Sequence, residues 1–180
     1  MIELNKDLQK KHHHRKWLPK YITESGILIE TGTHTGEGVE AGLAFGYKKV
    51  ISIESNEKFY TEAKMRFYEE IGCGKVELHL GESGKLLPII LSGLHGKRLT
   101  FFIDAHIGGA RSPILEELDA IKGHSSKDHI IMIDDYSDYV NKYYRISIRQ
   151  VIEKLYELNS DYKFGFEETS KGLNVMIAIV

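Results

Sequence analysis

Three acidic residues end two apolar runs in the second half of the chain. Asp104 ends the apolar run 100–104, and Asp134 and Asp135 stand at the end of the apolar run that begins near residue 129. If the two runs are neighbouring parallel strands, their ends lie about 4.8 Å apart at one edge of a sheet. Like charges this close raise one another's pKa, so a cation would stabilise the group. Carboxylate oxygens favour a hard ion, and we expect Asp104, Asp134 and Asp135 to bind Mg²⁺, Ca²⁺ or Mn²⁺.

His106 is the expected general base, acting together with Asp104. An unperturbed imidazole has a pKa near 6.5 and accepts a hydroxyl proton at neutral pH. A metal beside it would lower the pKa of that hydroxyl. Other interpretations stay open: the aspartates could cap a helix and bond the loop, His106 could only order Gly108 and Gly109, and His34 is a rival base.

The segment from Gly26 to Gly36 combines a short apolar run, the carboxylate of Glu30 and a loop punctuated by glycines. A tight loop followed by a helix is suited to a small polar ligand. A dinucleotide needs a three-glycine fingerprint, and the charge of Glu30 would repel its pyrophosphate. Glu30 would instead bind an ammonium group while the loop amides bind a carboxylate. S-adenosylmethionine offers both groups.

Glu54 ends the predicted strand 49–54, with Ser55 directly after it. Its distance from the glycine loop is typical of an acidic residue that binds ribose hydroxyls. The alternative is a surface glutamate that opens the helix beginning near Asn56.

Six segments, in the same order along residues 27–136, resemble class I S-adenosylmethionine-dependent methyltransferases, and more narrowly a bacterial and phage subgroup with a Glu-Thr-Gly-Thr first motif. They are Glu30-Thr31-Gly32-Thr33 with Gly36, Ser52-Ile53-Glu54, Gly81-Glu82-Ser83, Phe102 to His106, Ser112 to Leu118, and Ile133-Asp134-Asp135. The resemblance implies that the cofactor contacts Glu30, Thr31, Gly32, Thr33, Gly36, Glu54, Ser55 and Asp104, with Gly81, Glu82 and Ser83 at the adenine. Metal-dependent sugar and small-molecule O-methyltransferases carry a similar acidic trio. His34 departs from the general motif, which has its second glycine there.

Alternating apolar and amphipathic runs predict the elements that position these residues. The predicted strands are 27–31, 49–54, 75–80, 100–104, 129–134, 161–166 and 173–180, and the predicted helices are 36–46, 57–71, 83–92, 112–122 and 142–158. The last two strands are expected to form an antiparallel hairpin. The resemblance implies a Rossmann-like α/β fold, with a mostly parallel seven-stranded sheet in the order 3-2-1-4-5-7-6 and helices on both faces. Ligands bind such a sheet where strand order reverses, here between Glu30 and Asp104.

The length of 180 residues favours one methyltransferase domain over residues 27–180, preceded by a helical segment over residues 1–26. A net charge of −2 gives no reason to expect nucleic acid or a membrane surface as a partner. The chain has no run apolar enough to span a membrane, no signal-peptide core and one cysteine, which favours a cytoplasmic location. The basic run 10–16 is interpreted as a solvated helix face; it could instead steer an acidic substrate or bind a metal.

We therefore expect methyl transfer from S-adenosylmethionine to a hydroxyl of a small, sugar-like acceptor, with Arg111 as an anion contact. The alternatives are a metal-independent or nitrogen-directed methyltransferase, a non-catalytic nucleotide-binding module, and a metal-dependent phosphohydrolase. The phosphohydrolase is disfavoured because it leaves Glu30 and Glu54 without a role. A second subunit could complete the acceptor pocket, so a homodimer is a further expectation.

Overall fold

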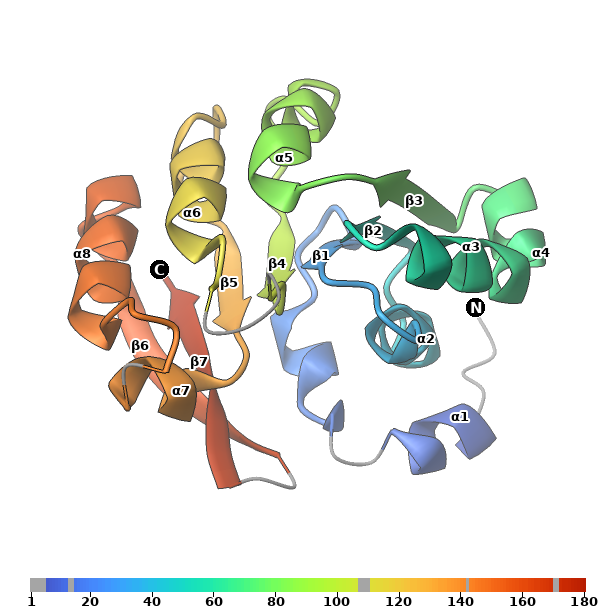
Figure 1. The fold of residues 1–180 in the computed structure, drawn as a ribbon, viewed down its shortest axis with the longest axis horizontal. Coiled ribbons are helices and arrows are strands. Elements are labelled where there is room, and N and C mark those ends of the chain that lie inside the picture. Colours follow the sequence, from blue (N-terminus) through green and yellow to red (C-terminus); the bar gives the residue numbers. More distant parts are fainter. Residues whose placement is uncertain (1–5, 13–14, 107–110, 142, 170–171) are drawn as a thin grey trace.

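The computed structural model describes residues 6–12, 15–106, 111–141, 143–169 and 172–180 (Figure 1). These residues form a seven-stranded sheet in the order β3-β2-β1-β4-β5-β7-β6, which confirms the predicted order. The strands are β1 (Ile27–Thr31), β2 (Lys49–Glu54), β3 (Val76–Leu80), β4 (Thr100–Ile103), β5 (Ile130–Ile133), β6 (Lys163–Thr169) and β7 (Gly172–Ile179). The first five run parallel, and β7 pairs antiparallel with both β5 and β6.

Helices cover both faces of the sheet (Figure 1). One face carries α5 (Ser83–Ser92), α6 (Ile114–Lys122) and α8 (Ile148–Leu158), and the short α7 (Tyr136–Val140) follows β5. The other face carries α2 (Glu37–Ala44), α3 (Glu57–Arg66) and α4 (Tyr68–Gly72). The N-terminal elements α1 (Lys6–Lys11) and the 3₁₀ helix η2 (Leu18–Tyr21) lie on this second side.

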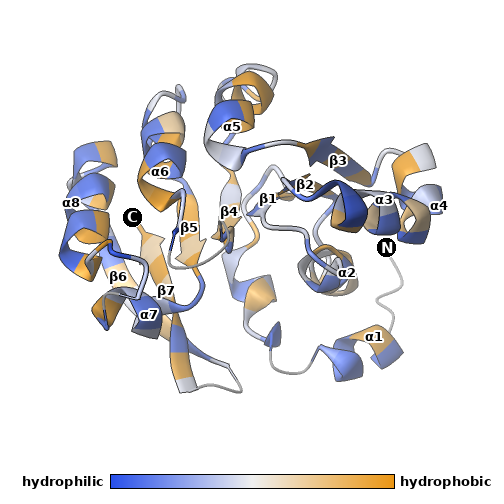
Figure 2. Cartoon of the chain, in the orientation of Figure 1, coloured by the Kyte–Doolittle hydropathy of each residue, from blue (hydrophilic) through white to orange (hydrophobic). Residues whose placement is uncertain are grey.

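Two apolar clusters pack between these layers because the inner strands alternate their side chains. Ile29 of β1 faces α5 and α6, whereas Leu28 faces α2, and both are at most 1% exposed. A strand buried on both faces must be apolar throughout, and β5 is coloured so along its whole length in Figure 2. Each such side chain stabilises the fold by about 1.5–3 kcal/mol. The sheet is therefore a rigid base for whatever its carboxyl edge carries.

Two predicted helices differ from those observed, and one observed helix was not predicted. The helix predicted over residues 57–71 ends at Arg66 and restarts at Tyr68, because Phe67 is 4% exposed and turns into the core. The helix predicted over residues 142–158 begins only at Ile148, where Ser147 and Gln150 form a capping box. The prediction also missed α7.

The N-terminal segment is less helical than expected and belongs to the core. Within its described part, helix is confined to α1 and η2. Trp17 and Leu18 are 3% and 2% exposed and pack in the cluster on the α2 face of the sheet. Over the described ranges, every helix is too short or too polar to cross a bilayer.

Candidate active site

A cavity of about 1090 Å³ opens at the carboxyl edge of the sheet, where strand order reverses. Eight of the residues singled out in the sequence line it: Gly32, Glu54, Ser55, Gly81, Glu82, Ser83, Asp104 and His106. Arg111 also lines it, as does His34. The glycines at 108 and 109 lie outside the described residues. The cavity thus brings together side chains from four strand ends.

Glu30, Thr31, Thr33 and Gly36 lie outside this lining. Glu30 is 2% exposed, and its Oε2 accepts a hydrogen bond from Ser52 Oγ at 2.6 Å. Burial raises the pKa of Glu30 to about 8, while Ser52 and the charge of Arg15 oppose the rise. The sequence placed Glu30 at a ligand's ammonium group, but the structure places it behind the loop that forms the cavity wall.

The amides of the loop after β1 already donate within the chain. Gly32 N and Thr33 N donate to Ile53 O at 2.9 and 3.3 Å, His34 N donates to Glu54 Oε2 at 2.7 Å, and Gly36 N donates to Thr33 O at 2.7 Å. These four amides were expected to bind a carboxylate, and in the structure they hold the loop itself.

Three residues of this loop, Gly32, His34 and Gly36, have a left-handed backbone, and His34 is the one that is not a glycine. Gly32 has φ 87°, and a Cβ there would lie 2.7 Å from the backbone oxygen of Asp104. His34, at the glycine position of the general motif, has φ 46°. Its ring lies 4.3 Å from that of Phe59, centroid to centroid, and both rings line the cavity. The departure from the motif therefore keeps the glycine-like backbone and adds an aromatic wall.

Glu54 is held from two sides at the end of β2. Its Oε2 accepts the amide of His34, and its Oε1 accepts the amide of Asn56 at 2.8 Å. Each carboxylate oxygen can accept more than one hydrogen bond, so this side chain retains capacity for two further donors. A pair of ribose hydroxyls meets that requirement.

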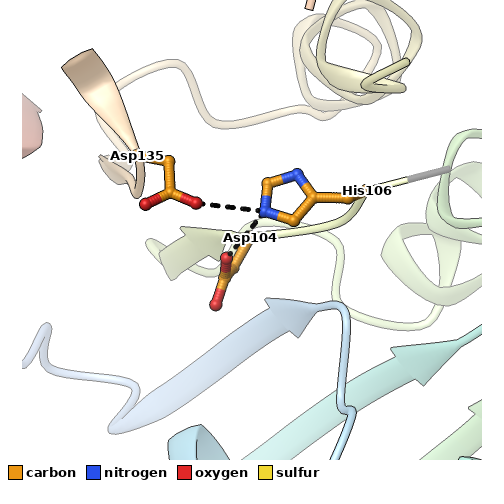
Figure 3. Close-up of side chains that lie close together, drawn as sticks. All are labelled: Asp104, His106 and Asp135. Carbon is orange, nitrogen blue, oxygen red and sulfur yellow. Dashed lines mark ion pairs between the residues drawn. The ribbon is translucent and has the colours of Figure 1, made fainter. Parts of the chain in front are cut away.

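Asp104, His106 and Asp135 form the second group at the cavity (Figure 3). His106 Nε2 lies 3.4 Å from Asp104 Oδ1 and 3.3 Å from Asp135 Oδ2. Burial alone would lower the pKa of His106, but the two carboxylates raise it to about 9. The imidazole therefore carries a proton at neutral pH and balances the two aspartates, which differs from the free base that the sequence suggested.

Asp134 stands apart from this group. Its Oδ1 accepts the amide of Asp135 at 2.8 Å, and burial together with the charge of Asp104 raises its pKa to about 6. Asp135 has φ 51°, so the chain leaves the strand there and turns this side chain toward His106. Among the described residues, the group whose ligand atoms lie within 4.8 Å of one another is Asp104, His106 and Asp135. The structure thus brings together two of the three expected metal ligands and adds His106.

Two positioning residues were missed in the sequence. Asn174 of β7 is 2% exposed and donates from Nδ2 to Asp135 Oδ1 at 3.0 Å. Tyr144 stacks on His106, with ring centroids 4.9 Å apart and planes 11° apart. An asparagine inside an apolar strand was an available signal for the first, whereas no motif marked Tyr144.

No protein-family model and no curated protein matches the sequence, but solved structures match the fold. The O-methyltransferase TomG from Streptomyces achromogenes, in complex with SAM, has a TM-score of 0.60 at 18% identity, over 100% of this chain and 83% of TomG. An O-methyltransferase from Bacillus cereus, in complex with SAH, has a TM-score of 0.61 at 17% identity, over 100% and 93% of the two chains. SAH-bound methyltransferase PaMTH1 from Podospora anserina has a TM-score of 0.59 at 16% identity, over 86% and 71%. The chain has the class I methyltransferase fold.

Proposed function

We propose that this protein is an S-adenosylmethionine-dependent methyltransferase that acts on a hydroxyl of a small molecule. The observation that carries the proposal is the cavity at the strand reversal, which Glu54, Asp104 and His106 line, with Asp135 against His106. Three of the structural neighbours are in complex with SAM or SAH. In this assignment Glu54 binds the ribose hydroxyls, and Glu82 and Ser83 face the adenine.

The acceptor lies beyond the cofactor in the same cavity. A volume of about 1090 Å³ exceeds what a single small ligand fills and leaves room for a second, sugar-sized molecule. Arg111 also lines the cavity and is exposed. Its guanidinium would bind an anionic group of the acceptor. The residues favour a polar small molecule over nucleic acid, because the net charge of the chain is −2.

Methyl transfer forms a bond from the acceptor oxygen to the methyl carbon and breaks the bond from that carbon to sulfur. The hydroxyl proton must leave as the new bond forms, and we assign its acceptance to the Asp104–His106 pair, with the carboxylate of Asp104 as the free base. Asp135 and Asn174 hold the imidazolium in place. Alignment and exclusion of water contribute the rest of the rate.

The same group fits a hard divalent cation, because it offers two carboxylates and an imidazole nitrogen within 4.8 Å of one another. Such an ion would supply positive charge that lowers the pKa of the acceptor hydroxyl. Metal-independent transfer is the alternative, and it has support in the charge of His106, which already balances the two aspartates.

Calorimetric binding of S-adenosylhomocysteine tests the cofactor assignment. We expect the wild type to bind it and Glu54→Gln to weaken binding roughly ten- to hundredfold, since charged hydrogen bonds contribute about 1.5–3 kcal/mol. Glu57→Gln, three residues along in the exposed first turn of α3, is the matched control and should leave the affinity unchanged. A wild type that does not bind S-adenosylhomocysteine would contradict the proposed function.

Thermal melting with and without Mg²⁺, Ca²⁺ or Mn²⁺ tests the cation site. Millimolar cation should raise the melting temperature of the wild type, because a ligand that binds only the folded state stabilises it. Asp135→Asn should abolish the rise, whereas Asp161→Asn, an exposed aspartate outside the site, should retain it. If the wild-type curve responds neither to chelator nor to any of the three ions, the metal site is absent and the metal-independent alternative holds.

A further inference from the structure

The N-terminal segment places one cation of the basic run under the carboxyl edge of the sheet. The guanidinium carbon of Arg15 lies 5.0 Å from the ring centroid of Phe102, on β4. Trp17 anchors the segment, since it is 3% exposed and its ring centroid lies 6.4 Å from the same ring. Arg15 is therefore held against the sheet and is not part of a fully solvated helix face.

Glu30 approaches the same place from β1. The point that a Cβ of Gly38 would occupy lies 1.6 Å from Glu30 Oε1 and 2.9 Å from Arg15 Nη1. The carboxyl and the guanidinium thus converge on the first turn of α2, in space that any other residue at position 38 would fill. Glycine at this position is what lets the two charged groups come together beside the helix.

The charges around Glu30 come from three other elements. Burial is the main cause of the raised pKa of Glu30, and Asp104 at the end of β4 and Glu54 at the end of β2 add to it. The hydrogen bond from Ser52 and the charge of Arg15 oppose the rise. Burial and the charge of Asp104 raise the pKa of Asp134, and Arg15 opposes that rise. Phe102 of β4 and Met132 of β5 lie on the α2 face of the sheet together with Leu28. Asp104 and Asp134 follow them by two residues in the alternation of the strands. Arg15, which lies over Phe102, is therefore on the same face.

We propose that Arg15 is the internal counter-ion of Glu30 and, through it, a positioning residue for the cofactor loop. When Glu30 is ionised, above its pKa, its carboxylate only accepts hydrogen bonds, so Ser52 Oγ must donate to Glu30 Oε2. Ser52 Oγ then accepts from Thr33 Oγ1, which lies 2.6 Å away in the loop. The charge of Arg15 in this way fixes the direction of a hydroxyl chain that ends at the cofactor loop.

The acids at this edge of the sheet form two sets, which differ in the positively charged side chain that lies nearest to them. Arg15 compensates Glu30 and Asp134 from within the protein. Asp104 and Asp135 face His106, and Asp104 and His106 line the cavity. The role as a loop-positioning residue rests on the proposed function, whereas the pairing of Arg15 with Glu30 does not.

A double-mutant cycle by thermal melting tests the pairing without any ligand. Arg15→Met keeps an apolar stem over Phe102 and removes the charge, and Glu30→Gln removes the opposite charge. At pH 9, above the pKa of Glu30, the double variant should melt about 2–4 °C higher than the two single losses predict together. At pH 6, where Glu30 is protonated, this coupling should disappear. Lys16→Met, an exposed neighbour, should show no coupling with Glu30→Gln at either pH.

Additive losses at pH 9, or a coupling that is equal at both pH values, would overturn the counter-ion assignment, because packing alone does not depend on the charge of Glu30. If Arg15→Met fails to fold at pH 9, the double variant decides: recovery of folding by Glu30→Gln supports the pairing, and an equal failure rejects it. Arg15→Lys, which keeps a charge, should retain part of the coupling.

Calorimetry at pH 9 tests the positioning role. Arg15→Met should weaken S-adenosylhomocysteine binding roughly three- to thirtyfold, and Lys16→Met should leave it unchanged. Unchanged affinity in Arg15→Met would reject the positioning role while the pairing stands. A wild type that does not bind S-adenosylhomocysteine would count against the proposed function, and the melting cycle would still decide whether Arg15 pairs with Glu30.

Discussion

The carboxyl of Glu117 lies entirely inside the protein, between the first turn of α5 and the end of β1. Its Oε1 accepts a hydrogen bond from Ser83, a residue of the cavity wall, and Thr31 also bonds to the carboxyl. Its Oε2 is buried and has no hydrogen-bond partner among the described residues. Burial raises the pKa of Glu117 to about 7, while the bonds from Ser83 and Thr31 oppose the rise. A proton on this group therefore stabilises the folded chain.

This leads to a pH dependence with a definite sign. The pKa of Glu117 in the folded chain lies above its ordinary value of 4.5, so its contribution to stability is complete below about pH 4.5 and is lost as pH rises through 7. Glu117→Gln removes that titration. Relative to the variant, the wild type should lose about 1–3 kcal/mol of unfolding free energy between pH 4.5 and 8, measured by urea denaturation.

Glu116→Gln is the matched control, since its side chain is exposed one residue away. It should keep the titration of Glu117 and lose stability as the wild type does, with the midpoint lowered only by the loss of the Glu116 charge. Wild-type and Glu117→Gln curves that run parallel over this range would show that Glu117 does not titrate there.

Residue positions at strand ends could be predicted from the sequence, but their surroundings could not. Glu54 and Asp104 line the cavity as expected, because the end of a parallel strand fixes where its next side chain lies. The burial of Glu30 depends on Gly38 and Arg15, which approach from two other elements. The group at the site contains His106 and not the expected Asp134, because the backbone of Asp135 is left-handed. No local sequence pattern predicted that turn.

At the scale of elements, two buried histidines, His124 and His129, connect helix ends to strand starts at the edge of the sheet opposite the cavity. Leu99 N, just before β4, donates to His129 Nδ1 at 3.1 Å. His129 must then donate from Nε2 to His124 Nδ1, 3.0 Å away, and His124 donates from Nε2 to Leu94 O at 3.1 Å. The chain of bonds ties the end of α5 and the end of α6 to the starts of β4 and β5, and it requires both rings to be neutral.

Acid should break this connection. Burial lowers the pKa of His129 to about 4, below its ordinary value of 6.5, and the charge of His124 adds to the effect. The stability that it provides is present above pH 6.5 and is lost as pH falls toward 4, because the unfolded chain binds the proton first. His129→Asn, which keeps an acceptor for Leu99, should melt lower at pH 7 but lose about 1–3 kcal/mol less between pH 6.5 and 4.

The exposed His95, whose ring lies 6.4 Å from that of His124, provides the comparison. His95→Gln should lose stability in acid as the wild type does. Equal acid losses in the wild type and in His129→Asn would exclude His129 as the titrating group.

Element boundaries were predictable where local chemistry marks them. The predicted strands 27–31 and 49–54 and the predicted helix 83–92 match β1, β2 and α5. The late start of α8 had its own signal in Ser147 and Gln150, and the apolar periodicity upstream concealed it. The break at Phe67 had no such signal, because it arises from burial against Gly36 of the loop.

Across the whole molecule, strand order was predictable because six motifs resemble those of class I methyltransferases, and the order of the strands in that fold is known. Pairing of the hairpin β6–β7 followed from the short connection between the strands. The distribution of charge was not predictable, since the net charge of −2 conceals a concentration of carboxyls at one edge of the sheet. Five elements that are distant in sequence contribute to that edge, and only their packing shows which acids face one another.

The loop after β1 is held by bonds within the chain, since four of its amides donate to Ile53, Glu54 and Thr33. A segment that is already ordered loses little conformational entropy when it binds, so association should not wait for a slow rearrangement of this loop. The encounter would then be limited by diffusion and dehydration, and selectivity would reside in the dissociation rate. Evolution could alter that rate through charges that surround the loop, such as Arg15, while the backbone template stays the same.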